Sequence, residues 1–148
     1  MTTLNNQNLL QLRFVSQSHI DAVKPSFANL PANPYADGAF RKRRYSVIKV
    51  VDGELKLQPT KAFVQDDSIN TFQGNVERTY ENLEDSLLAS NGMKQIVNQF
   101  REMTGISADR DIEIHQFRML AIDSDTPAAP EGVHQDGFDH VCVCGVSH

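Results

Sequence analysis

A histidine and an aspartate separated by one residue, His134-Gln135-Asp136, stand near the end of this 148-residue sequence. In an extended segment, residues i and i+2 point to the same side, so this imidazole and this carboxylate would face one point in space. With a second histidine from a distant strand, they would form the two-histidine, one-carboxylate site that binds Fe(II) and leaves coordination positions open. The motif is short, and a loop histidine beside a turn aspartate is the alternative interpretation.

The residues around this pair favour the metal site. The strand-like His115-Gln-Phe-Arg118 precedes the stretch Pro130-Glu-Gly-Val-His-Gln-Asp-Gly137. Together they resemble the 2-oxoglutarate/Fe(II)-dependent dioxygenase family that includes bacterial free L-amino-acid hydroxylases of the L-isoleucine 4-hydroxylase type. Tyr35–Tyr45 (YADGAFRKRRY) is similar to an early Arg-Arg-Tyr segment of that family, and Gln73–Arg78 is similar to its Gly-x-x-Arg segment. The resemblance covers roughly residues 30 to 148.

The resemblance implies an enzyme that hydroxylates a free L-amino acid, with Fe(II) as cofactor and 2-oxoglutarate as cosubstrate. It assigns iron ligation to His134 and Asp136 and names no other catalytic residue. It also implies a second iron histidine and a 2-oxoglutarate-binding arginine beyond His148, so we expect the sequence to be truncated at its C-terminal end. Two alternatives stay open, namely an inactive truncated family member and a self-associating binding module.

Three other side chains, those of Arg118, Arg78 and Glu131, are candidates for contacts at or near the site. Arg118 and Arg78 carry guanidinium groups that suit a substrate carboxylate and suit a structural partner equally well. Glu131 is close in sequence to the two metal-ligand candidates, with a solvated loop carboxylate as the alternative. His115 alternates with Phe117, which favours a hydrogen-bonded core histidine.

Composition and charge limit the classes of protein that fit. With 40% hydrophobic and 22% charged residues, the chain is typical of one globular domain spanning residues 1–148. A net charge of −5 argues against a nucleic-acid partner, and we interpret the short basic run Arg41–Arg44 as a solvated strand edge. Neither a signal peptide nor a membrane-length apolar run is present, which predicts a cytoplasmic protein with no membrane partner. Cys142 and Cys144 are expected to be reduced core thiols.

Periodicity predicts the elements that must position these residues. Asp52-Gly53 between two alternating apolar runs indicates a β-hairpin. Apolar residues at helical spacing predict a helix from Ser18 to Phe27, and either two helices or one broken helix over residues 81–104. The remaining predicted strands are Ala62–Gln65, Ile112–Ile122 (covered on both faces) and Phe138–Val146.

This order of strands, helices and strands predicts an α+β fold with an antiparallel sheet. The resemblance implies more, namely a double-stranded β-helix (a cupin-like jelly roll) with flanking helices, incomplete at its C-terminal end. The last strand, Phe138–Val146, would then have an unpaired apolar edge. Such an edge is a place where two copies of the chain can associate, so a homo-oligomer through this strand is expected as an alternative partner to the small-molecule substrate.

Overall fold

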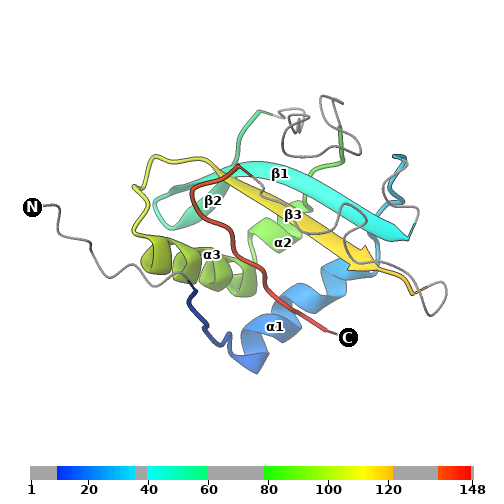
Figure 1. The fold of residues 1–148 in the computed structure, drawn as a ribbon, viewed down its shortest axis with the longest axis horizontal. Coiled ribbons are helices and arrows are strands. Elements are labelled where there is room, and N and C mark those ends of the chain that lie inside the picture. Colours follow the sequence, from blue (N-terminus) through cyan, green and yellow to red (C-terminus); the bar gives the residue numbers. More distant parts are fainter. Residues whose placement is uncertain (1–9, 36–39, 60–78, 122–136, 148) are drawn as a thin grey trace, which may run out of the picture.

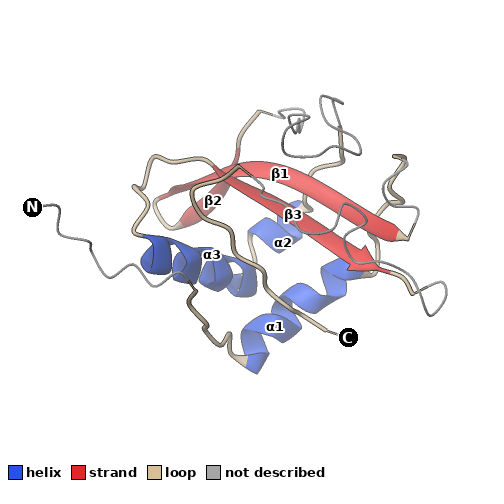
Figure 2. Ribbon diagram, viewed as in Figure 1, coloured by secondary structure: helices blue, strands red, loops and turns tan. Residues whose placement is uncertain are grey.

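The computed structural model describes residues 10–35, 40–59, 79–121 and 137–147 of the chain. In these ranges it contains three strands and three α-helices, together with one 3-10 helix. They are α1 (Gln17–Val23), η1 (Lys24–Phe27), β1 (Arg41–Val51), β2 (Glu54–Leu57), α2 (Asp85–Leu88), α3 (Asn91–Thr104) and β3 (Ile112–Met119). The strands form one antiparallel sheet in the order β2-β1-β3, and the α-helices lie together on one side of it (Figure 1; Figure 2). The α+β prediction is confirmed.

The hairpin between β1 and β2 turns at Asp52 and Gly53. Their φ angles are 52° and 77°, and two successive positive values are typical of a type I′ turn. This turn matches the natural twist of the strands that it joins. The hairpin predicted from the Asp-Gly pair is therefore confirmed.

The pairing of β1 with β3 divides the sheet into two faces. Tyr45 lies opposite His115, and Ile48 lies opposite Ile112. Opposed residues of antiparallel strands point to the same side, and successive residues alternate. One face, called here the helix face, carries Ser46, Ile48, Val50, Ile112 and Ile114. The other, called here the far face, carries Arg43, Tyr45, Val47, Glu113, His115 and Phe117.

The main hydrophobic core lies between the helix face and the α-helices. Ile48 is fully buried at its centre. Side chains of all three α-helices and of the three strands contribute to it; the buried members are Val23, Ile48, Leu55, Leu83, Leu87, Leu88, Met93, Val97 and Ile112. A smaller buried cluster of Tyr45, Val47 and Tyr80 lies on the far face.

Of the two alternatives predicted for residues 81–104, the structure has two helices, α2 and α3. The hydroxyl of Ser90 caps α3 by accepting a hydrogen bond from the backbone N–H of Met93 at 3.1 Å. Gly105 ends α3 with a left-handed φ of 67°. Gly92 lies inside α3 and packs closely against α1: a methyl group there would lie 2.9 Å from Val23 Cγ1 and closer still to the His19 carbonyl oxygen.

The structure corrects the interpretation of the basic run Arg41–Arg44. This run begins the central strand and is no solvated edge. β3 pairs with one side of it, and on the other side Ala32 bridges to Lys42 while the Arg43 N–H donates to the Pro31 carbonyl. Arg43 is only 7% exposed. Arg44 is largely buried as well and forms an ion pair with Glu81 at 3.0 Å.

Three predictions near the C-terminal end are also corrected. Residues 137–147 contain no strand, so the predicted strand Phe138–Val146 is wrong for the part of the chain that is described. Cys142 and Cys144 are exposed free thiols and do not belong to the core. β3 is not covered on both faces along its whole length, since Phe117 on the far face is 42% exposed.

The predicted strand Ala62–Gln65 lies outside the described residues. Among the helices that the structure does describe, none has the length and apolar character needed to cross a membrane.

Candidate functional site

Four of the five predicted site residues, namely His134, Asp136, Arg78 and Glu131, lie outside the described residues. The fifth, Arg118, is exposed near the end of β3 and lies opposite Lys42 on the helix face. Within the described ranges, no three His, Cys, Asp or Glu side chains come close enough together to hold a metal ion. Ligation by His134 and Asp136 thus stays a prediction from sequence.

The far face of the sheet holds a polar cluster that the sequence did not reveal. It is built around Arg43 of β1 and His115 of β3, whose side chains meet across the strand pair. Arg43 Nη2 lies 2.8 Å from His115 Nδ1, and the guanidinium carbon of Arg43 lies 4.2 Å from the centre of the Tyr80 ring. A guanidinium over a tyrosine face is a favourable cation–π geometry. The expectation that His115 is hydrogen-bonded is confirmed.

Tyr45 fixes the other side of this cluster. Its ring centre lies 4.7 Å from that of His115, with the two planes tilted by 36°. Burial raises the pKa of Tyr45 well above its ordinary value, and the charge and hydrogen bond of Glu113 add to the rise. Tyr45 is therefore a neutral phenol that donates to the Glu113 carboxylate. The imidazole of His115 is consequently held by a stacked ring on one side and a cation at one nitrogen.

The electrostatics of His115 follow from these neighbours. Burial and, after it, the positive charge of Arg43 lower the pKa of His115 from 6.5 to about 3. Because Arg43 stays protonated and has only donors, His115 Nδ1 must accept their hydrogen bond. The hydrogen of the neutral ring therefore sits on Nε2. His115 is a fixed neutral donor at physiological pH.

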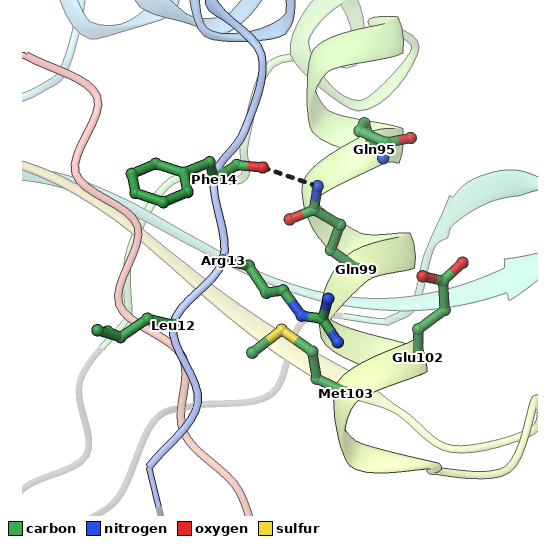
Figure 3. Close-up of a pocket in the computed structure, with 7 residues that line it drawn as sticks. All are labelled: Leu12, Arg13, Phe14, Gln95, Gln99, Glu102 and Met103. Atoms are coloured by element: carbon green, nitrogen blue, oxygen red, sulfur yellow. Dashed lines mark hydrogen bonds between the residues drawn. The ribbon is translucent and has the colours of Figure 1, made fainter.

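A cavity of about 380 Å³ lies elsewhere, between the segment before α1 and one side of α3 (Figure 3). Its wall is formed by Leu12, Arg13, Phe14, Gln95, Gln99, Glu102 and Met103, and Gln99 Nε2 donates to the Phe14 carbonyl at 3.2 Å. Since α3 packs on the helix face, this cavity is separated from the Arg43–His115 cluster by the sheet. None of the predicted site residues lines it.

Comparison with known proteins gives one family and two similar solved structures. The family model described as "2OG-Fe dioxygenase" matches residues 24–148. The crystal structure of a bsmA homolog from Methylobium petroleophilum PM1 is 24% identical, with a TM-score of 0.60, over 81% of this chain and 51% of that one. The crystal structure of IDO from Bacillus thuringiensis is 23% identical, with a TM-score of 0.47, over 69% of this chain and 44% of that one. No curated protein matches the chain.

The chain thus spans about half the length of these two solved structures. The likeness to the bsmA homolog concerns the fold alone at this level of identity. The family match is broader, because it covers both strands of the Arg43–His115 cluster and the His134-Gln135-Asp136 motif.

Proposed function

Because the chain belongs to the 2OG-Fe dioxygenase family, we propose that it hydroxylates a free L-amino acid at the expense of O₂ and 2-oxoglutarate. The observation that carries the proposal is the family match, which includes the stretch Pro130–Gly137 with its histidine and aspartate. In the balanced reaction, a substrate C–H bond becomes C–OH while 2-oxoglutarate is oxidised to succinate and CO₂. Membership of the family implies Fe(II) and 2-oxoglutarate as the required partners.

The chemistry of the predicted donors suits a ferrous ion. His134 supplies a neutral nitrogen ligand and Asp136 an anionic oxygen ligand, which are two of the three ligands of the facial arrangement. When bound, the ion supplies the redox chemistry that couples decarboxylation of the oxo acid to oxidation of the substrate. The residues of the chain would hold the ion, orient the two small molecules and keep water away.

The jelly-roll architecture forms part of this proposal. The described three-stranded antiparallel sheet, with helices on one face, is compatible with one wall of such a fold. The similarity in fold to the bsmA homolog, over 81% of this chain, supports the proposal. In that arrangement the helices would cover the outside of the wall, and the far face with Arg43 and His115 would look toward the reaction site.

The reaction is tested by measuring succinate formed by the purified protein with Fe(II), ascorbate, 2-oxoglutarate and each proteinogenic L-amino acid. We expect succinate in amounts that depend on one or a few of the amino acids, together with a product heavier by one oxygen atom. Asp136→Ala should abolish both. The exposed Asp139, whose only described ion pair is a contact with Arg110 at 3.5 Å, provides the matched control Asp139→Ala, which should keep activity. Failure of every amino acid to stimulate succinate formation would contradict the proposal.

Self-association is a second candidate function, favoured by exposed apolar side chains in residues 137–147. Val143 is 90% exposed, and Phe138 and Val141 are also exposed. Such side chains can be buried against a second copy of the chain. We expect a concentration-dependent dimer in sedimentation experiments, and Val143→Asp should shift it to monomer because a carboxylate would have to be buried. A wild-type protein that stays monomeric at all concentrations would contradict this candidate.

A further inference from the structure

The cavity of about 380 Å³ between α3 and the segment before α1 presents two opposite charges to one space (Figure 3). We propose that it binds the zwitterionic head group of a free α-amino acid, with Arg13 holding the carboxylate and Glu102 holding the ammonium group. The inference goes beyond the proposed reaction, because this binding needs neither the metal ion nor 2-oxoglutarate.

Two parts of the chain form opposite walls of this cavity. Gln95, Gln99 and Glu102 are spaced by four and three residues, so they lie along one side of α3. The segment before α1 supplies Arg13, whose guanidinium extends toward α3 beside Gln99 (Figure 3). Gln99 Nε2 donates to the Phe14 carbonyl at 3.2 Å, and this contact holds the segment against the helix. The two charged groups are therefore brought together by packing of the segment on α3.

The guanidinium of Arg13 and the carboxylate of Glu102 are both available to a ligand. Within the ranges that the structure describes, neither side chain takes part in an ion pair or a hydrogen bond. Both side chains are exposed, so a small molecule can reach them without a rearrangement of the chain. Because the two groups line one cavity without contacting each other, a molecule that carries one charge of each sign can lie between them.

The position of Glu102 favours a cationic group at its end of the cavity. Glu102 lies in the last turn of α3, which ends at Thr104. The free carbonyl groups at the C-terminal end of a helix carry partial negative charge, and here the carboxylate adds to it. An ammonium group offers three hydrogen-bond donors, which suit a carboxylate and carbonyl oxygens. We therefore expect the ammonium group of the ligand at this end.

Arg13 favours an anionic group on the opposite wall. Its guanidinium offers a planar fork of donors that can form two parallel hydrogen bonds with a carboxylate. A carboxylate and an ammonium group joined through one carbon atom are the feature that free α-amino acids share. A volume of about 380 Å³ leaves room for a side chain as well. The chemical class that fits both walls is therefore a free α-amino acid.

The binding test compares L-alanine with propionate and ethylamine, each of which carries one half of its head group. Each probe is titrated into metal-free protein, and the side-chain N–H signals of Arg13 and Gln99 are followed by ¹H–¹⁵N NMR. Since the charged groups are exposed, we expect a Kd for L-alanine on the order of 1 mM. Propionate and ethylamine should each bind about fivefold more weakly. If either bound as tightly as L-alanine, the site would hold a single ion only, and the inference would be overturned.

Substitutions test the two assigned roles. Arg13→Gln and Glu102→Gln should each weaken L-alanine binding by about fivefold. Arg101→Gln is the matched control and should bind as wild type does, because Arg101 precedes Glu102 on α3 but does not line the cavity. Arg13→Glu combined with Glu102→Arg exchanges the two charges, so the double variant should bind more tightly than either reversal alone. Unchanged binding in both Gln variants, or an equal loss in the control, would refute the assignment.

The outcomes also separate this inference from the proposed function. L-alanine should shift the Gln99 signal in Asp136→Ala as it does in wild type, because binding at Arg13 and Glu102 does not involve the metal. If an amino acid stimulates succinate formation but L-alanine leaves the Gln99 signal unmoved, only this inference fails. If the signal moves and no amino acid stimulates succinate formation, only the proposed function fails.

Discussion

Replacing Gly92 by alanine is expected to destabilise the protein by about 3 kcal/mol or more. The new methyl group would lie 2.9 Å from Val23 Cγ1 and in hard contact with the carbonyl oxygen of His19. A backbone carbonyl cannot rotate away as a flexible side chain can, so α1 and α3 would have to separate. That movement would loosen a core to which Val23 and Val97 contribute from either side.

Urea unfolding followed by circular dichroism measures this effect. Gly145→Ala is the matched control, because among the described residues, apart from its two chain neighbours, no heavy atom lies within 4 Å of the position of its added methyl group. We expect the control to remain within about 0.5 kcal/mol of wild type. A Gly92→Ala protein as stable as the control would show that α1 and α3 do not pack at this glycine.

The second large effect concerns metal binding. Asp136→Ala and His134→Ala should each weaken binding of Mn(II), used as a redox-stable substitute for Fe(II), by about a hundredfold or more. Loss of an outer-shell partner typically costs 10–100-fold in metal affinity, and a direct ligand should cost at least as much. The loss should be larger for Asp136, since its carboxylate provides the negative charge of the pair.

Anaerobic calorimetry provides the affinities. His140→Ala is the matched control, because His140 belongs to the same stretch of sequence and is exposed in the structure. We expect it to bind Mn(II) as wild type does. If all three variants lost affinity to the same degree, the site would be a diffuse cluster of histidines and carboxylates, and the facial arrangement would be wrong.

The parts of the fold that depend on local sequence could be predicted. Asp52-Gly53 specifies its turn through backbone conformation, so the hairpin was found from a few residues. The paired helices α2 and α3 followed from apolar spacing that needs no knowledge of distant partners. In both cases the structure-forming signal lies within a short stretch of chain.

The predictions were wrong where pairing with a segment distant in the sequence determines the local structure. The basic run Arg41–Arg44 pairs with β3, which lies more than sixty residues later in the sequence. The hydrophobic periodicity of the run gives no indication of such pairing. The alternation of Val141 and Val143 with Cys142 and Cys144 is typical of a strand. A strand, however, requires a neighbouring strand to form its backbone hydrogen bonds. In the part of the chain that is described, residues 137–147 form no strand.

In the candidate site, too, the features set by a short stretch of sequence could be predicted and those set by distant residues could not. The motif at His134 and Asp136 is contiguous and could be recognised from sequence, together with the family. The cluster of Arg43 and His115 joins residues that are 72 positions apart, so only the strand register brings it together. The sequence indicated only that His115 alternates with Phe117 in a strand, whereas Arg43 stands between Lys42 and Arg44 in a basic run.

The central claim, that this chain binds iron through His134 and Asp136 and presents it to 2-oxoglutarate, is tested most directly by one anaerobic titration. Fe(II) is added to the protein in the presence of 2-oxoglutarate, and the visible charge-transfer absorption of the chelate is recorded. The account predicts a saturable absorption at one iron per chain in wild type and none in Asp136→Ala. An absorption of equal strength in both proteins, or in neither, would contradict it.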